Sequence, residues 1–131
     1  MMYLIVDEAY AFDYLSILDV KVDEIRTSEC SEAFLRCYQI LKDQMNDIES
    51  VMKSKEYSDL KEANRMVFML VDKAKRDEVK ASEVDRGNYE RCKKRKALQD
   101  RFFGGVVTEV KVGYEVYDEV KSENSSSVIR H

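Results

Sequence analysis

FLRCYQILKDQMNDIESVM, residues 34–52, places an apolar side chain at alternating intervals of four and three residues. This spacing follows the 3.6-residue turn of an α-helix, so the apolar side chains gather on one face. Residues 27–31 are rich in Ser and Thr, which cap helix N-termini, so we expect the helix to begin there and continue to residue 52. The apolar stripe consists of Phe34, Tyr38, Leu41, Met45, Ile48 and Met52.

Similar spacing predicts a helix on each side of this one. Residues 2–27 carry one apolar stripe and a second stripe beside it, which predicts a wide face that contacts two neighbours. The alternation within residues 18–22 leaves a short strand as the local alternative. The other helix starts after Ser58, its expected N-cap, and carries an apolar stripe from Leu60 to Ala74. The stripes are Leu4, Ala11, Leu15, Leu18, Val22 and Ile25 with Val6, Tyr10, Tyr14 and Ile17 beside them, and Leu60, Ala63, Val67, Leu70 and Ala74.

A short loop at residues 54–58 predicts an antiparallel hairpin of the second and third helices, which would bring Asp47 near Arg65. A fourth, shorter and basic helix is expected to open within residues 82–87 and to run to Phe103, with two glycines as its stop. Since the chain has no proline and only four glycines, its composition also favours long helices.

The sequence changes character after residue 105, where valines alternate with polar residues over 106–120. Alternation with a period of two is typical of a β-strand. We therefore expect a mainly all-α protein: an antiparallel bundle of three long helices plus the basic helix, with an extended or β-like C-terminal arm. Residues 1–121 form a single domain that includes this arm at 106–121, and residues 122–131 form a flexible tail.

Positive charge is concentrated in residues 86–101, where seven residues are basic and two are acidic, a net charge of +5. The first 62 residues have the opposite balance, with seven basic residues against fourteen acidic ones, a net of −7. This segregation predicts an acidic partner, either inside the molecule or outside it. The predicted partner-binding residues are Tyr89, Arg91, Lys93, Lys94, Arg95, Lys96 and Arg101.

On this basis we expect a small, non-catalytic interaction, regulatory or assembly protein whose basic fourth helix docks on an acidic protein surface. A nucleic-acid-binding protein that uses the same helix is the first alternative, although no recognition motif for DNA is visible. The helical wheel does not gather the cations cleanly, because Arg91 and Arg95 stand beside the apolar Leu98 and Phe102. Such a helix is expected to lie half-buried, with the stems of its basic residues covered.

An enzyme would have to use carboxylates and a metal, because the only histidine is the last residue and no nucleophile or phosphate-loop motif occurs. A Mg²⁺-dependent helical nucleotide hydrolase is therefore the second alternative, with Glu29 and Glu32 on one helix and Glu56 and Asp59 on the next. A continuous second helix would hold Glu32 and Glu56 about 36 Å apart, too far to share an ion. We predict no catalytic residues, no metal site and no cofactor.

Glu8 is the one charged residue at a core-type position of the first helix, near Asp7 and Asp13. A buried carboxylate must be paired, protonated or bound to metal, and Arg91 or Arg95 could pair with it. A frayed or exposed helix start is the simpler explanation.

No apolar window is long enough to span a membrane, and the three cysteines have no close pair, so we expect a cytoplasmic protein with packed thiols and no membrane contact. The wide apolar face of the first helix also predicts a homo-oligomer.

Overall fold

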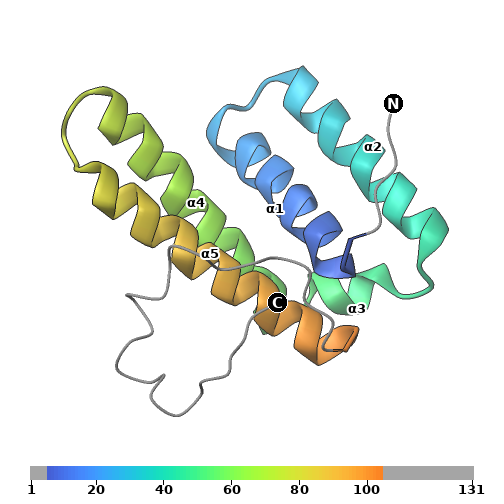
Figure 1. Cartoon of the computed structure of the whole chain (residues 1–131). Coiled ribbons are helices and arrows are strands. Elements are labelled where there is room, and N and C mark those ends of the chain that lie inside the picture. The colour runs from blue at the N-terminus through green and yellow to red at the C-terminus, as the bar shows by residue number, and fades with distance from the viewer. Residues whose placement is uncertain (1–5, 105–131) are drawn as a thin grey trace, which may run out of the picture.

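The computed structural model describes residues 6–104, which form five α-helices and contain no β-strand (Figure 1). The chain is thus mainly helical, as its composition and apolar spacing predict. The first five residues, the arm at 106–121 and the tail at 122–131 lie outside the described residues, so their predicted structure stays a prediction. The helices are α1 (Glu8–Glu24), α2 (Ser28–Gln44), α3 (Ile48–Met52), α4 (Lys55–Lys75) and α5 (Ala81–Phe102).

Helix α1 lies between α2 on one side and the antiparallel pair of α4 and α5 on the other (Figure 1). Two neighbours for α1 agree with its wide apolar face. The expected hairpin of the second and third helices is wrong, because α2 packs against α1 and the hairpin is formed by α4 and α5 instead. Arg65 accordingly lies beside Asp23 and Glu24 of α1, and not beside Asp47.

The helix predicted to continue to residue 52 ends at Gln44, and this prediction is wrong. Met45 has an extended backbone, with φ −132° and ψ 143°, and a separate short helix, α3, begins at Ile48. The carboxylate of Asp47 caps α3 by accepting a hydrogen bond from the amide of Ser50 at 3.3 Å. The apolar stripe survives the break, because Met45 and Met52 still pack against the core.

Other helix limits also differ from the expected ones. The first helix begins at Glu8, and residues 18–22 are helical and not a strand. Helix α4 is capped by the Ser54 hydroxyl, which accepts from the amide of Tyr57 at 3.1 Å, so Ser58 is not its N-cap. The basic helix, expected to be short, is the longest of the described helices at 22 residues.

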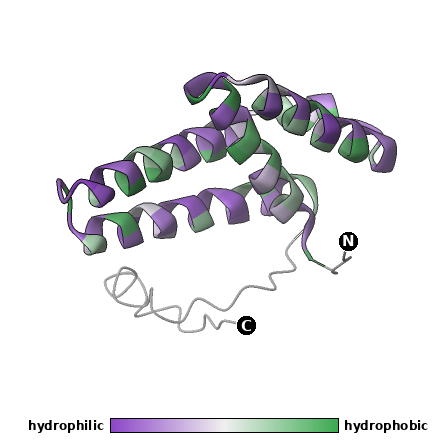
Figure 2. Ribbon diagram, turned by 90° about the horizontal axis from the view of Figure 1, so that it is seen from above, coloured by the Kyte–Doolittle hydropathy of each residue, from purple (hydrophilic) through white to green (hydrophobic). Residues whose placement is uncertain are grey.

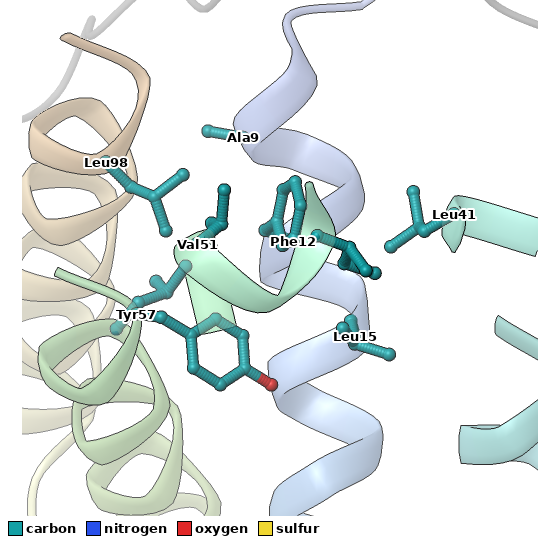
Figure 3. Packing of buried hydrophobic residues seen from close by; sticks show 9 residues of the cluster. Ala9, Phe12, Leu15, Leu41, Val51, Tyr57 and Leu98 are labelled. Carbon is teal, nitrogen blue, oxygen red and sulfur yellow. The ribbon is translucent and has the colours of Figure 1, made fainter. Parts of the chain in front are cut away.

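A single hydrophobic core receives side chains from all five helices (Figure 3). Phe12 and Leu15 of α1, Leu60 of α4 and Leu98 of α5 are completely inaccessible to solvent. In Figure 2, hydrophobic and hydrophilic residues alternate in short bands along the helices, as expected for amphipathic helices that share one core. The core also includes Ala9, Leu41, Ile48, Val51 and Tyr57.

Among the cysteines, Cys92 is buried, whereas Cys30 and Cys37 are partly exposed, and all three are free thiols. Burial raises the pKa of the Cys37 thiol above its ordinary value. Within residues 6–104, no helix is both long enough and apolar enough to cross a membrane.

Candidate functional site: the cationic surface of helix α5

Helix α5 carries the candidate site, and local interactions fix both of its ends. At the start, the amide of Lys80 donates to the carboxylate of Glu83 at 3.0 Å. At the end, the amide of Gly104 donates to the carbonyl of Gln99 at 2.9 Å. Gly104 has φ +98°, a conformation that L-residues with a side chain rarely adopt, so the predicted glycine stop is confirmed.

The inner side of α5 is buried and includes two of the seven predicted partner-binding residues. Tyr89 is 4% exposed and Arg95 is 6% exposed, so neither can contact an outside partner in this fold. Cys92, Leu98 and Gln99 complete this inner side. We therefore remove Tyr89 and Arg95 from the candidate contact set.

Arg95 is bound inside the molecule by α1. Its Nη1 donates to Oδ2 of Asp13 at 2.7 Å, and both side chains are 8% exposed. The guanidinium also lies 4.3 Å from the ring centroid of Tyr10, and its Nη2 lies 3.4 Å from Sγ of Cys92. Burial opposes the charged guanidinium, but the hydrogen bond and the charge of Asp13 outweigh it, so the pKa of Arg95 is raised above its ordinary value.

The Asp13–Arg95 pair belongs to a buried polar network that also includes α4. The amide nitrogen of Asn64 donates to Oδ1 of Asp13 and to Oγ of Ser16, both at 2.8 Å. The Ser16 hydroxyl in turn donates to the carbonyl of Asp13 at 2.8 Å. The network satisfies both carboxylate oxygens of Asp13 and links α1, α4 and α5 through side chains.

Sequence reasoning missed most of this network. It singled out Glu8 at a core-type position, with an exposed helix start as the simpler explanation, and that explanation is confirmed because Glu8 is exposed. Asp13, five residues later, is the buried carboxylate. Glu8 accepts a hydrogen bond from Gln99 at 3.0 Å, and the basic partner proposed for Glu8 pairs with Asp13 instead. The available signal was Asn64, a polar residue four positions after Leu60 on the apolar side of its helix.

Gln99 was also missed, and it joins the ends of α5 and α1. Its side-chain oxygen accepts a hydrogen bond from the amide of Ala9 at 2.8 Å, and it is 3% exposed. Amides in the first turn of a helix have no partner within that helix. Gln99 therefore caps α1 from a position 90 residues away in the sequence. Sequence spacing gives no signal for such a contact.

The outer side of α5 keeps four of the predicted cations at the surface. Lys93 pairs with Glu90 at 3.7 Å and lies 5.2 Å from the ring centroid of Tyr89. Lys96 pairs with Asp100 at 2.8 Å, one turn away. Lys94 is partly exposed and makes no ion pair with residues 6–104. We call Lys93, Lys94, Lys96 and Arg101 the cationic surface.

Arg101 connects the cationic surface to α4. Its Nη1 donates to Oε1 of Glu56 at 2.5 Å, while 54% of the Arg101 side chain remains exposed. This hydrogen bond lowers the pKa of Glu56 below its ordinary value. Arg91, the seventh predicted residue, is partly buried, and its Nε is enclosed without a hydrogen-bond partner among residues 6–104.

The acidic residues of α1 are satisfied mainly by α4. Lys61 pairs with Asp19 at 3.2 Å and with Asp23 at 3.0 Å. Arg65 pairs with Asp23 and Glu24, both at 3.3 Å. Among residues 6–104, Arg95 is therefore the residue of α5 that forms an ion pair with α1. The four residues of the cationic surface form no ion pair with α1.

The carboxylates of the hydrolase alternative do not meet in a cluster. Glu29 and Glu32 lie in the first turns of α2, whereas Glu56 and Asp59 lie at the start of α4 and engage Arg101 and Lys55. The expected 36 Å between Glu32 and Glu56 required one continuous helix to residue 52, whereas α2 ends at Gln44. No three His, Cys, Asp or Glu side chains are close enough to hold a metal ion within the part of the chain that the structure describes.

Comparison with known proteins adds no relative. No protein-family model, curated protein or solved structure matches this chain.

Proposed function

We propose that this chain is a non-catalytic interaction protein whose cationic surface binds an acidic surface of another protein. The observation that carries the proposal is the division of α5 into two sides. Its inner side supplies Arg95 and the core contacts, and its outer side leaves Lys93, Lys94, Lys96 and Arg101 in reach of solvent. Among residues 6–104, the three lysines make no ion pair with another helix, whereas Arg101 pairs with Glu56 of α4.

The ion pairs that Lys93 and Lys96 make within the chain are easily exchanged. Lys93 and Lys96 pair with Glu90 and Asp100 on the same helix, and both members of each pair are at least 40% exposed. Exposed pairs of this kind contribute about 0–1 kcal/mol each. Carboxylates of a partner can replace Glu90 and Asp100 in these pairs at little cost in free energy. Attraction between opposite charges would also speed association with the partner.

Two parts of the proposal rest on the sequence alone. The cysteine pattern favours a cytoplasmic location, and spare apolar surface, mainly the wide face of the first helix, favours self-association. The seven-residue contact set is reduced to the cationic surface, with Arg91 at its edge.

Binding of a fluorescent polyglutamate peptide, compared with duplex DNA and single-stranded RNA at low salt, tests the proposal. We expect the peptide to bind and the combined variant Lys93→Glu, Lys94→Glu, Lys96→Glu to lose binding. The matched control reverses Lys42, Lys53 and Lys55, three exposed lysines on other elements. No binding to the peptide would overturn the proposal, and tighter binding to nucleic acid would replace it with the nucleic-acid alternative. Mg²⁺-dependent hydrolysis of nucleotides would overturn its non-catalytic part.

A further inference from the structure

The end of the α4–α5 hairpin that lies farthest from the core contains no buried residue. Between Asn64 and Tyr89, which are both buried, all 24 residues from 65 to 88 are at least partly exposed. We call residues 65–88 the distal hairpin. Its two helices extend past the end of α1 in Figure 1, and the contacts of α1 with α4 include Arg65 near that end.

The distal hairpin includes six consecutive apolar residues, MVFMLV, at positions 66–71 of α4. Six successive positions surround a helix completely, and a helix that is apolar on all sides is normally covered on all sides. Here Met66 is 47% exposed, Met69 is 42% exposed and Val71 is 37% exposed. A helix presented to water in this way marks an interaction surface.

Helix α5 covers one side of this run and leaves the others open. Val67 and Leu70 face Gly87 of α5, where a Cβ atom would lie 3.5 Å and 2.9 Å from their methyl groups. Beside this contact, one hollow of about 350 Å³ is lined by Phe68, Val71 and their charged neighbours. A second hollow of about 490 Å³ lies between α4 and α5 and shares Val71.

Charge favours a second copy of this chain as the occupant. Six basic and five acidic residues make the hairpin nearly neutral, with a net charge of +1 in a chain of net charge −4. A strongly acidic or strongly basic partner would therefore gain little electrostatic attraction from this surface.

The margins of the hollows are self-complementary, because Asp72 and Lys75 border one and Lys75 and Asp85 border the other. In a two-fold arrangement, the lysine of one copy can face an aspartate of the other copy, and the reverse contact forms by symmetry. We propose that two copies pack distal hairpin against distal hairpin, burying residues 66–71 within a four-helix bundle.

This proposal deepens the self-association that is part of the proposed function, on which it rests, and it uses a surface other than the cationic surface. The cationic surface begins at Lys93, after the distal hairpin has ended. Loss of dimers and loss of acidic-peptide binding are therefore separate results, and either can fail alone.

Sedimentation equilibrium of the full chain over a wide concentration range tests the dimer. We expect reversible dimers, and we expect Met69→Glu and Val71→Glu each to raise the dimer Kd at least about tenfold, because each places a charge in the apolar interface. Leu35→Glu is the matched control: Leu35 is 61% exposed on α2, and the change should leave the Kd unaltered. Circular dichroism checks that each variant is folded.

Hydrogen exchange of the unaltered chain gives a second, independent measurement. Amides of residues 66–71 should become more protected as concentration rises, while those of α2 should not change. A protein that stays monomeric throughout, or glutamate variants that dimerise normally, would overturn the proposal. Concentration-independent protection of residues 66–71 in a monomer would also overturn it.

Discussion

The ion pair of Asp13 and Arg95 is the most heavily buried charge interaction among the described residues that pair. Burying two charges costs several kcal/mol per ion, and their attraction offsets this only when the remaining polar atoms are also satisfied. Asn64 meets this requirement by donating a hydrogen bond to the other carboxylate oxygen of Asp13. The pair therefore fixes how α5 sits against α1, although an apolar pair of similar volume could be equally stable.

Replacing Arg95 with Met should lower the free energy of unfolding by about 3–5 kcal/mol, because the Asp13 carboxylate would stay buried without its cation. Urea denaturation measures the loss. Lys96→Met is the matched control on the same helix, and its exposed pair with Asp100 should cost at most about 1 kcal/mol. In the double variant Asp13→Leu, Arg95→Met, we expect less than the sum of the single losses. Equal losses for Arg95→Met and Lys96→Met would contradict the assigned role.

Tyr57 should set part of the alkaline stability. Its hydroxyl donates to Oδ2 of Asp19 at 3.1 Å and the residue is 4% exposed, and burial followed by the charge of Asp19 raises its pKa well above the ordinary value. Because the folded pKa is raised, this contribution to stability is complete below the unfolded pKa of about 10 and is lost as pH rises beyond it.

Ultraviolet titration of tyrosinate measures this effect. The folded protein and the Tyr57→Phe variant should titrate the same number of tyrosines until the chain unfolds, and the unaltered chain should then release one more. Release of that extra tyrosinate at the ordinary tyrosine pKa, before unfolding, would show that Tyr57 is not buried as described.

Arg95 also shows why the contact set could be predicted only in part. The sequence identified the basic segment, and the wheel placed Arg95 beside Leu98, which correctly indicated a covered stem. It did not indicate that the charged group itself is buried, since that depends on Asp13, 82 residues earlier. Charge clusters are visible in sequence, whereas their partners depend on how distant segments fold.

At the scale of elements, the close approach of α4 and α5 depends on Gly87. A Cβ atom at this position would lie 2.9 Å from Cδ1 of Leu70, a partly exposed side chain that can move. Gly87→Ala should therefore change the free energy of unfolding by less than about 1 kcal/mol, because the higher helix propensity of alanine offsets the crowding. Gly87→Leu should destabilise by about 1–3 kcal/mol.

Thermal unfolding of the two Gly87 variants provides the measurement. Ala81→Leu, at the exposed first residue of the same helix, is the control for adding the larger side chain. If Gly87→Leu were as stable as the unaltered chain, the two helices could not be as close as the structure places them.

The break between α2 and α3 explains a different failure of sequence reasoning. The apolar spacing of four and three continues through Met45 and Ile48, because Met45, in the extended link after α2, and Ile48, the first residue of α3, reach the same core. Spacing reports which side chains are covered and does not establish that the backbone between them is helical. Asn46 and Asp47 were the available signal, since both are favoured at turns and helix starts.

At the scale of the whole molecule, the helical class followed from composition and spacing, but the neighbours of each helix did not. A short loop suggested that α2 and α4 are adjacent, yet α3 occupies the connection and α1 lies between them. Loop length limits how far apart two helix ends can be. It does not decide which apolar faces meet, because that choice depends on all five helices packing at once.

The arrangement predicts unequal stability across the molecule. Helix α1 has seven buried residues and contacts α2, α4 and α5, whereas α2 has one buried residue, Leu41, and packs mainly on α1. Elements with few buried contacts open without global unfolding. Hydrogen exchange followed by mass spectrometry should therefore show α2 amides exchanging through local opening, while α1 amides exchange only when the whole chain unfolds.

Low concentrations of urea distinguish exchange through local opening from exchange through global unfolding. Exchange in α1 should accelerate with urea, because global unfolding exposes a large surface, whereas exchange in α2 should depend on urea only weakly. Leu41→Ala should speed exchange in α2, since it shortens the one buried side chain of that helix. Leu35→Ala, at an exposed site on the same helix, is the control and should have little effect. Equal protection and equal urea dependence in α1 and α2 would mean that the five helices unfold as one unit, and α2 would then be as firmly held as the centre of the core.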